Sequence, residues 1–171
     1  GVDATGAALG NATNGVRISE GATGTAIGGA GETFRNVISA NGNNGVHITG
    51  AGTSGNTVFG NYIGTDPNGT AARTNGVGGV VIEGGATGNT VGSTTSGELN
   101  VISGNGVYGV GLFGSGTIGN TVAGNLLGTD ESGATALKNV KEGVRIGTSA
   151  SGNTIRENVL SGNGETGIKI E

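Results

Sequence analysis

Three aspartates occupy equivalent Gly-rich turns and are the residues best suited to acid–base chemistry. Asp3, Asp66 and Asp130 recur at every second turn of a repeat, which places neighbours about 10 Å apart if the turns stack as β-strands do. Inverting glycosidases use carboxylates about 6.5–9.5 Å apart, and Ca²⁺ takes six to eight oxygens, more than these turns offer. The structural alternative is that each aspartate caps its own turn through hydrogen bonds to nearby backbone. We expect capping, keep the three as weak metal candidates, and name no catalytic or cofactor-binding residue.

Two further rows of polar residues carry weaker signals. His47, the only histidine, belongs to an outward-facing row with Arg17, Arg145 and Lys169, and this row contains no carboxylate. A general base needs an orienting partner, so we expect a solvated face there. A second row, of threonines, resembles the flat arrays of some ice-binding solenoids, but it lacks the paired threonine row those proteins use. Its members are Thr57, Thr90, Thr121 and Thr154.

The elements that position these residues are three short phrases that cycle in a fixed order. The first phrase is G-V-x-I, found as "GVRI" at 15–18, "GVHI" at 45–48, "GVVI" at 79–82, "GVGL" at 109–112, "GVRI" at 143–146 and "GIKI" at 167–170. The second is G-N-T-V, at 55, 88 and 119, with the variants "GTAI" at 24–27 and "GNTI" at 152–155. The third is N-x-I, beginning at 36, 61 and 100, with the variants "NLL" at 125 and "NVL" at 158.

The spacing of the phrases defines a minimal turn of 24 residues with two kinds of insertion. Successive first phrases are 30, 34, 30, 34 and 24 residues apart. Six extra residues always lie between the second and third phrases of the 30-residue turns. The 34-residue turns carry nine extra residues between the third phrase and the next first phrase, and one more between the first phrase and the second. The insertions therefore alternate between two corners of one repeating unit.

Each phrase has the alternation and β-branched composition of a short strand, and glycine or asparagine interrupts every few residues. The sequence thus predicts an all-β fold, a three-sided, single-stranded parallel β-solenoid of about five to six coils over residues 1–171, a single domain with a thin aliphatic core. The predicted inward rows begin at Val16, Ile18, Ile27 and Ile38. No coil would fold alone, because each buries its apolar face only against its neighbours.

Asparagines and apolar residues form further rows in this arrangement. Two rows of asparagines are expected to bond amide to amide as structural ladders. They are Asn36, Asn61, Asn100, Asn125 and Asn158 at one corner, and Asn56, Asn89, Asn120 and Asn153 at another. An outward apolar stripe is a candidate interaction surface, with the alternative that the insertions fold over it. It comprises Val37, Tyr62, Val101, Leu126 and Val159.

Together, these phrases resemble the right-handed parallel β-helix proteins of the pectin-lyase-like superfamily. They are most similar to Gly- and Asn-rich repeats of bacterial cell-surface and secreted proteins, written around "GNTVxGNxIGTDxxGxxA", and the likeness covers essentially all 171 residues. The resemblance implies a right-handed coil, in line with the handedness of parallel crossovers. Because the fold hosts lyases, hydrolases, epimerases, adhesins and spacers, it does not select a function.

Composition narrows the classes of function. Glycine supplies 41 of 171 residues, the formal net charge is −4 with eight Lys and Arg, and cysteine is absent. No basic stripe for nucleic acid and no long apolar run for membrane insertion is present. Both ends of the chain fall within a cycle, so we expect a segment of a longer repeat array.

The leading hypothesis is a non-catalytic structural or adhesive segment of an extracellular or cell-surface bacterial protein, able to assemble end to end into a fibre. Its expected partners are other copies or adjoining coils, with glycans as a further candidate and no cofactor. The alternative is a carbohydrate-binding or polysaccharide-degrading module, lyase- or hydrolase-like. That reading would need clustered carboxylates and aromatic platforms, and the chain has only five aromatic residues.

Overall fold

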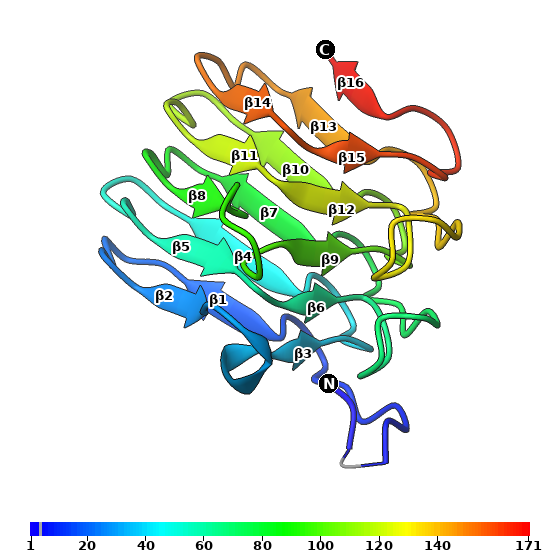
Figure 1. Ribbon diagram of the computed structural model, residues 1–171. Coiled ribbons are helices and arrows are strands. Elements are labelled where there is room, and N and C mark those ends of the chain that lie inside the picture. The colour runs from blue at the N-terminus through cyan, green and yellow to red at the C-terminus, as the bar shows by residue number, and fades with distance from the viewer. Residues whose placement is uncertain (4) are drawn as a thin grey trace.

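The protein is a parallel β-solenoid of about five turns (Figure 1). The computed structural model describes residues 1–3 and 5–171. Each turn lays one short strand on each of three sheets, as the three recurring phrases predict. Strands form here because the alternating β-branched residues suit a pleated, half-buried surface, and the glycines between them allow the chain to turn.

The three sheets run along the solenoid, and all their strands pair in parallel. The first sheet contains β1 (Val16–Ile18), β4 (Val46–Thr49), β7 (Val80–Glu83), β10 (Val110–Phe113), β13 (Val144–Gly147) and β16 (Ile168–Ile170). The second contains β2 (Ala26–Gly28), β5 (Thr57–Phe59), β8 (Thr90–Val91), β11 (Thr121–Ala123) and β14 (Thr154–Arg156). The third contains β3 (Val37–Ile38), β6 (Tyr62–Ile63), β9 (Asn100–Ile102), β12 (Asn125–Leu127) and β15 (Val159–Leu160).

The predicted register between turns is confirmed. Val46 lies opposite Val16 in one neighbouring strand and opposite Val80 in the other. The inward aliphatic side chains of the central turns are completely buried, for example Ile82 and Leu112. Each contributes about 1.5–3 kcal/mol of burial free energy, so the stability of the solenoid comes from stacking several turns.

Close stacking at the corners requires glycine at particular positions. Gly92 has a φ of 87°, and a Cβ there would lie 2.1 Å from the carbonyl oxygen of Ala123 in the next turn. Only glycine combines this left-handed backbone with such close approach. The Gly-rich composition is thus a consequence of the tight turns.

The nine-residue insertions are small antiparallel hairpins that project from the corner between the third and first sheets (Figure 1). Bridges join Thr65 to Ala72 and Thr129 to Ala136, and a bridge between Val2 and Ala8 marks a third hairpin. We call residues 2–3 together with 5–8, residues 65–72 and residues 129–136 the corner hairpins. Successive hairpins touch, because the N–H of Glu131 donates to the carbonyl oxygen of Gly69 at 3.0 Å.

The six-residue insertions lie within residues 29–35 and 93–99, which extend from the corner between the second and third sheets. We call them the short extensions. The first contains η1 (Glu32–Phe34), a 3-10 turn that is the only helical element in the described part of the chain. The two contact each other through a hydrogen bond of 3.1 Å from the N–H of Gly31 to the carbonyl oxygen of Gly97. No helix among the described residues is long and apolar enough to cross a membrane.

A buried serine in the turn before each of the later two hairpins contacts the base of that hairpin. The hydroxyl of Ser39 donates to the carbonyl oxygen of Thr65 at 2.7 Å and accepts the N–H of Gly64 at 3.1 Å. Ser103 makes the same two bonds to Thr129 and Gly128. Each compact corner therefore fixes the base of the hairpin in the next turn.

Candidate functional site

Both predicted rows of asparagines form hydrogen-bonded ladders. In the first, each side-chain amide nitrogen donates to the side-chain oxygen one turn further on: Asn36 to Asn61 at 2.9 Å, Asn61 to Asn100 at 3.3 Å, Asn100 to Asn125 at 2.9 Å and Asn125 to Asn158 at 2.8 Å. In the second, Asn56 donates to Asn89 at 2.9 Å, Asn89 to Asn120 at 3.0 Å and Asn120 to Asn153 at 3.1 Å. Every bond points toward the C-terminal turn, so the ladders are polar.

A third and longer ladder was missed by sequence reasoning. It runs from Asn11 to Asn41 at 2.9 Å, to Asn75 at 2.8 Å, to Asn105 at 3.0 Å, to Asn139 at 2.9 Å and to Asn163 at 3.0 Å. Each of these asparagines lies four residues before the glycine of a first phrase. That constant offset was the signal that could have found them.

The three candidate aspartates are engaged in their own corner hairpins. Oδ1 of Asp66 accepts the N–H groups of Thr70 at 2.8 Å and Ala71 at 3.0 Å. Oδ1 of Asp3 accepts from Thr5 and Ala7 in the same way. A carboxylate that accepts two backbone N–H groups holds a turn in place, and its lone pairs are less available for a substrate proton.

Asp130 makes the corresponding cap in the last hairpin. Its Oδ1 accepts the hydroxyl of Ser132 at 2.7 Å and the N–H of Thr135 at 3.2 Å. These bonds, that of Ser132 first, lower the pKa of Asp130 to about 2. The bond from the Thr5 side chain likewise lowers the pKa of Asp3. A lowered pKa favours the ionised carboxylate, the form that accepts the hydrogen bonds of the turn.

The apolar stripe is the floor of a groove on the outer face of the third sheet, between the corner hairpins and the short extensions. Tyr62, Val101 and Leu126, in the middle of the stripe, are buried, and Val37 is partly buried against them. Val159, at one end, is 44% exposed. The insertions therefore cover the centre of the stripe, which leaves little apolar surface for lateral association.

Arg35 reaches into this groove. Its guanidinium lies 4.1 Å from the centre of the Tyr62 ring, and its Nε is buried without a hydrogen-bond partner among the described residues. The side chain borders two hollows. One, of about 170 Å³, is lined by Tyr62, Leu99, Val101 and Leu126 among others. The other, of about 410 Å³, is lined by Glu32, Arg35, Tyr62, Pro67, Asn68, Thr70 and Glu131.

His47 has a carboxylate partner, contrary to the sequence expectation. Its Nε2 lies 2.9 Å from Oε1 of Glu83, which is one turn further on and two residues along the neighbouring strand. The expectation considered only the row containing His47 itself. The Glu83 side chain therefore reaches His47 diagonally, across two residues of the strand register.

An aromatic pair covers the next part of that face. The rings of Tyr108 and Phe113 lie 5.3 Å apart, and a Cβ on Gly111 would come within 2.4 Å of Phe113 and 2.7 Å of Tyr108. Gly111 therefore leaves room for both rings to lie against the sheet. Burial, together with the charge of Glu83, raises the pKa of Tyr108 to about 12.

Glu142 is a buried carboxylate near the end of the first sheet. It is 1% exposed, and neither side-chain oxygen has a hydrogen-bond partner among the described residues. Lys169 lies 4.0 Å away, and both Lys169 and Arg145 contact Glu171 at 2.7 Å. Hydrogen bonds from Lys169 and Arg145 lower the pKa of Glu171. The network joins β16 to β13 and places positive charge beside the buried carboxylate.

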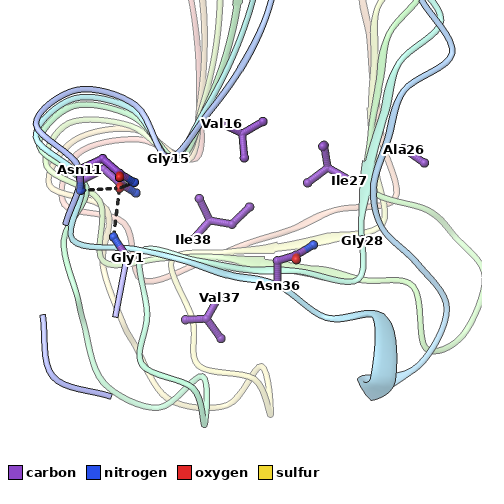
Figure 2. A pocket seen from close by; sticks show the side chains of 11 residues that line it. Gly1, Asn11, Gly15, Val16, Ala26, Ile27, Gly28, Asn36, Val37 and Ile38 are labelled. Atoms are coloured by element: carbon purple, nitrogen blue, oxygen red, sulfur yellow. Dashed lines mark hydrogen bonds between the residues drawn. The ribbon is translucent and has the colours of Figure 1, made fainter. Parts of the chain in front are cut away.

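The open face of the first turn forms a hollow of about 360 Å³ (Figure 2). Val16, Ile27 and Ile38 point into it, whereas Val37 points away from the lumen. The side-chain oxygens of Asn11 and Asn36 accept no hydrogen bond from the described part of the chain. In later turns, the equivalent oxygens accept from the preceding turn. This surface therefore has the chemistry of a contact between coils.

No group of three or more His, Cys, Asp or Glu side chains that could hold a metal ion occurs among the described residues. Comparison with known proteins finds no matching family model, no matching curated protein and no matching solved structure. The resemblance to β-helix repeats is therefore supported by the fold, its three parallel sheets and its asparagine ladders alone.

Proposed function

We propose that this chain is a non-catalytic structural or adhesive segment of an extracellular or cell-surface bacterial protein, in which coils are added to coils along one axis. The observation that carries the proposal is the polarity of the three ladders. Every amide nitrogen donates toward the C-terminal turn, and the first turn presents unfilled acceptors on Asn11 and Asn36 above an apolar hollow. A coil of the same design supplies the matching donors and aliphatic side chains.

The opposite face presents the complementary groups. In the preceding turns, the N–H groups of Asn120 and Asn125 donate to Asn153 and Asn158. The N–H groups of Asn153 and Asn158 have no acceptor among the described residues, and the neighbouring Ile170 is exposed. Donors at one face and acceptors at the other favour head-to-tail joining, which continues along one axis and does not close into a symmetric dimer.

The number of strands in each sheet determines what two copies would need in order to join end to end. The first sheet has six strands and the other two have five. Direct stacking of two copies would pair β16 with β1 and leave one strand missing from each of the other sheets. A continuous joint between two copies would therefore need one added strand in the second sheet and one in the third.

A tandem protein tests this proposal. Residues 114–127 contain β11 and β12, and Glu171 and Gly1 are equivalent to Phe113 and Gly128 in the repeat. Two copies joined by residues 114–127 are expected to form one straight rod with a single unfolding transition, seen by electron microscopy and denaturation. A matched control joined by a Gly/Ser segment of equal length should give two hinged rods. Two hinged rods from both proteins would contradict the proposal.

The groove supports a second candidate function, the binding of a carbohydrate by the third sheet. A guanidinium stacked on an aromatic ring, with Glu32 and Glu131 beside it, offers donors and acceptors suited to sugar hydroxyls. A glycan array with the intact chain would detect such binding. Arg35→Ala is expected to abolish it, whereas Arg156→Ala, on the second sheet, should leave it unchanged. If glycan binding were lost in both variants, or retained in both, the result would argue against this site.

A further inference from the structure

Seven asparagines of the chain directly precede a glycine, and one of them differs from the rest in its place and its hydrogen bonds. The seven are Asn14, Asn41, Asn44, Asn68, Asn75, Asn105 and Asn163. Six lie in the corners of the solenoid, where their side-chain oxygens or amides are hydrogen-bonded. Asn68 lies instead in the corner hairpin 65–72, is exposed, and makes no side-chain hydrogen bond within the described part of the chain.

An asparagine followed by glycine can modify itself without a catalyst. The backbone nitrogen of the glycine attacks the side-chain amide carbon, a carbon–nitrogen bond forms, and the side-chain nitrogen leaves as ammonia with the displaced proton. Water then opens the five-membered imide at either carbonyl and gives aspartate or isoaspartate. Glycine favours the attack because it has no Cβ to obstruct the ring.

In the ladder that runs from Asn11 to Asn163, hydrogen bonds oppose this ring closure, as Asn75 shows. The side-chain amide of Asn75 donates to Asn105 at 3.0 Å, and its oxygen accepts from Asn41 at 2.8 Å. The attacking nitrogen, that of Gly76, is itself bonded to the carbonyl oxygen of Asn41 at 2.8 Å. Ring closure at Asn75 would have to break these bonds inside a buried corner, which is costly for polar groups that water cannot reach.

Asn14 and Asn44, the two corner asparagines outside the ladders, are also restrained by hydrogen bonds. The oxygen of Asn14 accepts the N–H of Asn44 at 3.1 Å, and the oxygen of Asn44 accepts the N–H of Gly78 at 3.0 Å. At Asn68, by contrast, the side-chain amide is free of hydrogen bonds to the described residues. The attacking N–H, that of Gly69, makes one bond among the described residues, to the carbonyl oxygen of Asp66 at 3.0 Å.

We propose that Asn68 is a site of spontaneous deamidation, and that folding directs this modification to the hairpin tip and away from the ladders. This inference does not depend on the proposed function. The product adds a third carboxylate to the hollow already lined by Glu32 and Glu131. The modification therefore makes the wall of the groove more negative as the protein ages.

Peptide mapping by mass spectrometry tests the proposal on the full chain. After incubation at mildly alkaline pH, we expect deamidation of Asn68 about tenfold faster than at any of the other six sites, a factor that corresponds to ~1.4 kcal/mol. In denaturant, where no ladder exists, the seven sites should react at similar rates.

Asn68→Gln is the matched control, because the six-membered ring that glutamine would need forms far more slowly. It should remove the acidic species that accumulates on ion exchange, and Asn68→Asp should elute with that species. The proposal is overturned if Asn75 or Asn105 reacts as fast as Asn68 in the folded chain. It is also overturned if no site reacts in the folded chain while all seven react in denaturant.

Discussion

The side-chain amide of Asn105 donates a hydrogen bond of 2.9 Å to the side-chain oxygen of Asn139, one turn further along the solenoid. Both residues are completely buried. The oxygen of Asn105 in turn accepts from Asn75. A single asparagine therefore joins three turns, and its removal affects groups both above and below it.

Asn105→Ala is expected to destabilise the protein by about 1–3 kcal/mol. One N–H of the buried Asn75 amide loses its acceptor, while the other still donates to the carbonyl oxygen of Ile38. Chemical denaturation monitored by circular dichroism would measure the loss. Asn68→Ala, at an exposed site outside the ladders, is the control and should change stability by less than about 0.5 kcal/mol. Equal effects in the two variants would mean that the ladder does not stabilise the fold.

Ile82→Ala should cost about 2–4 kcal/mol, because Ile82 is completely buried in the middle of its row and the change leaves a cavity. Ile170 occupies the equivalent place in the last strand but is 74% exposed. Ile170→Ala should therefore have little effect on the same denaturation curve. If the two substitutions cost the same, the burial seen along this row is wrong.

Thr148→Gly is expected to stabilise the protein by about 0.5–1 kcal/mol. Thr148 is β-branched and has a φ of 54°, a left-handed conformation that such residues adopt only with strain. The equivalent residue two turns earlier is Gly84, with a φ of 64°. The melting temperature should rise, and a fall would show that the threonine side chain makes a stabilising contact.

The lowered pKa of Asp130 predicts that the free energy of unfolding falls at acidic pH. Its pKa in the folded protein is lowered to about 2 from an ordinary value of 3.8. The contribution of this group to the free energy of unfolding is therefore present above about pH 4 and is lost as the pH falls toward 2.

Denaturation curves at several pH values between 5 and 2 would measure this effect. Ser132→Ala removes the hydrogen bond that lowers the pKa most, so the variant should lose less stability on acidification than the wild type. An unchanged pH profile would show that the Ser132 hydroxyl does not hold the carboxylate in its ionised form.

The sequence was sufficient for the regular part of the fold and insufficient for the insertions. The alignment of Val46 with Val16 and Val80 follows from phrases of constant length, because equivalent residues of successive turns must stack. The contact of Arg35 with Tyr62 depends on the path of a short extension, which no repeat specifies. The pairing of His47 with Glu83 was missed for a related reason, since it crosses between rows.

The strand hydrogen bonds and the three ladders both run along the axis of the solenoid, from each turn to the next. A force that pulls the two ends of the rod apart would load these bonds in series, turn after turn, and the weakest junction would yield first. Each turn that unfolded would lengthen the molecule by the contour length of its chain, while the other turns stayed folded. A molecule built this way can absorb sudden tension by lengthening stepwise instead of breaking.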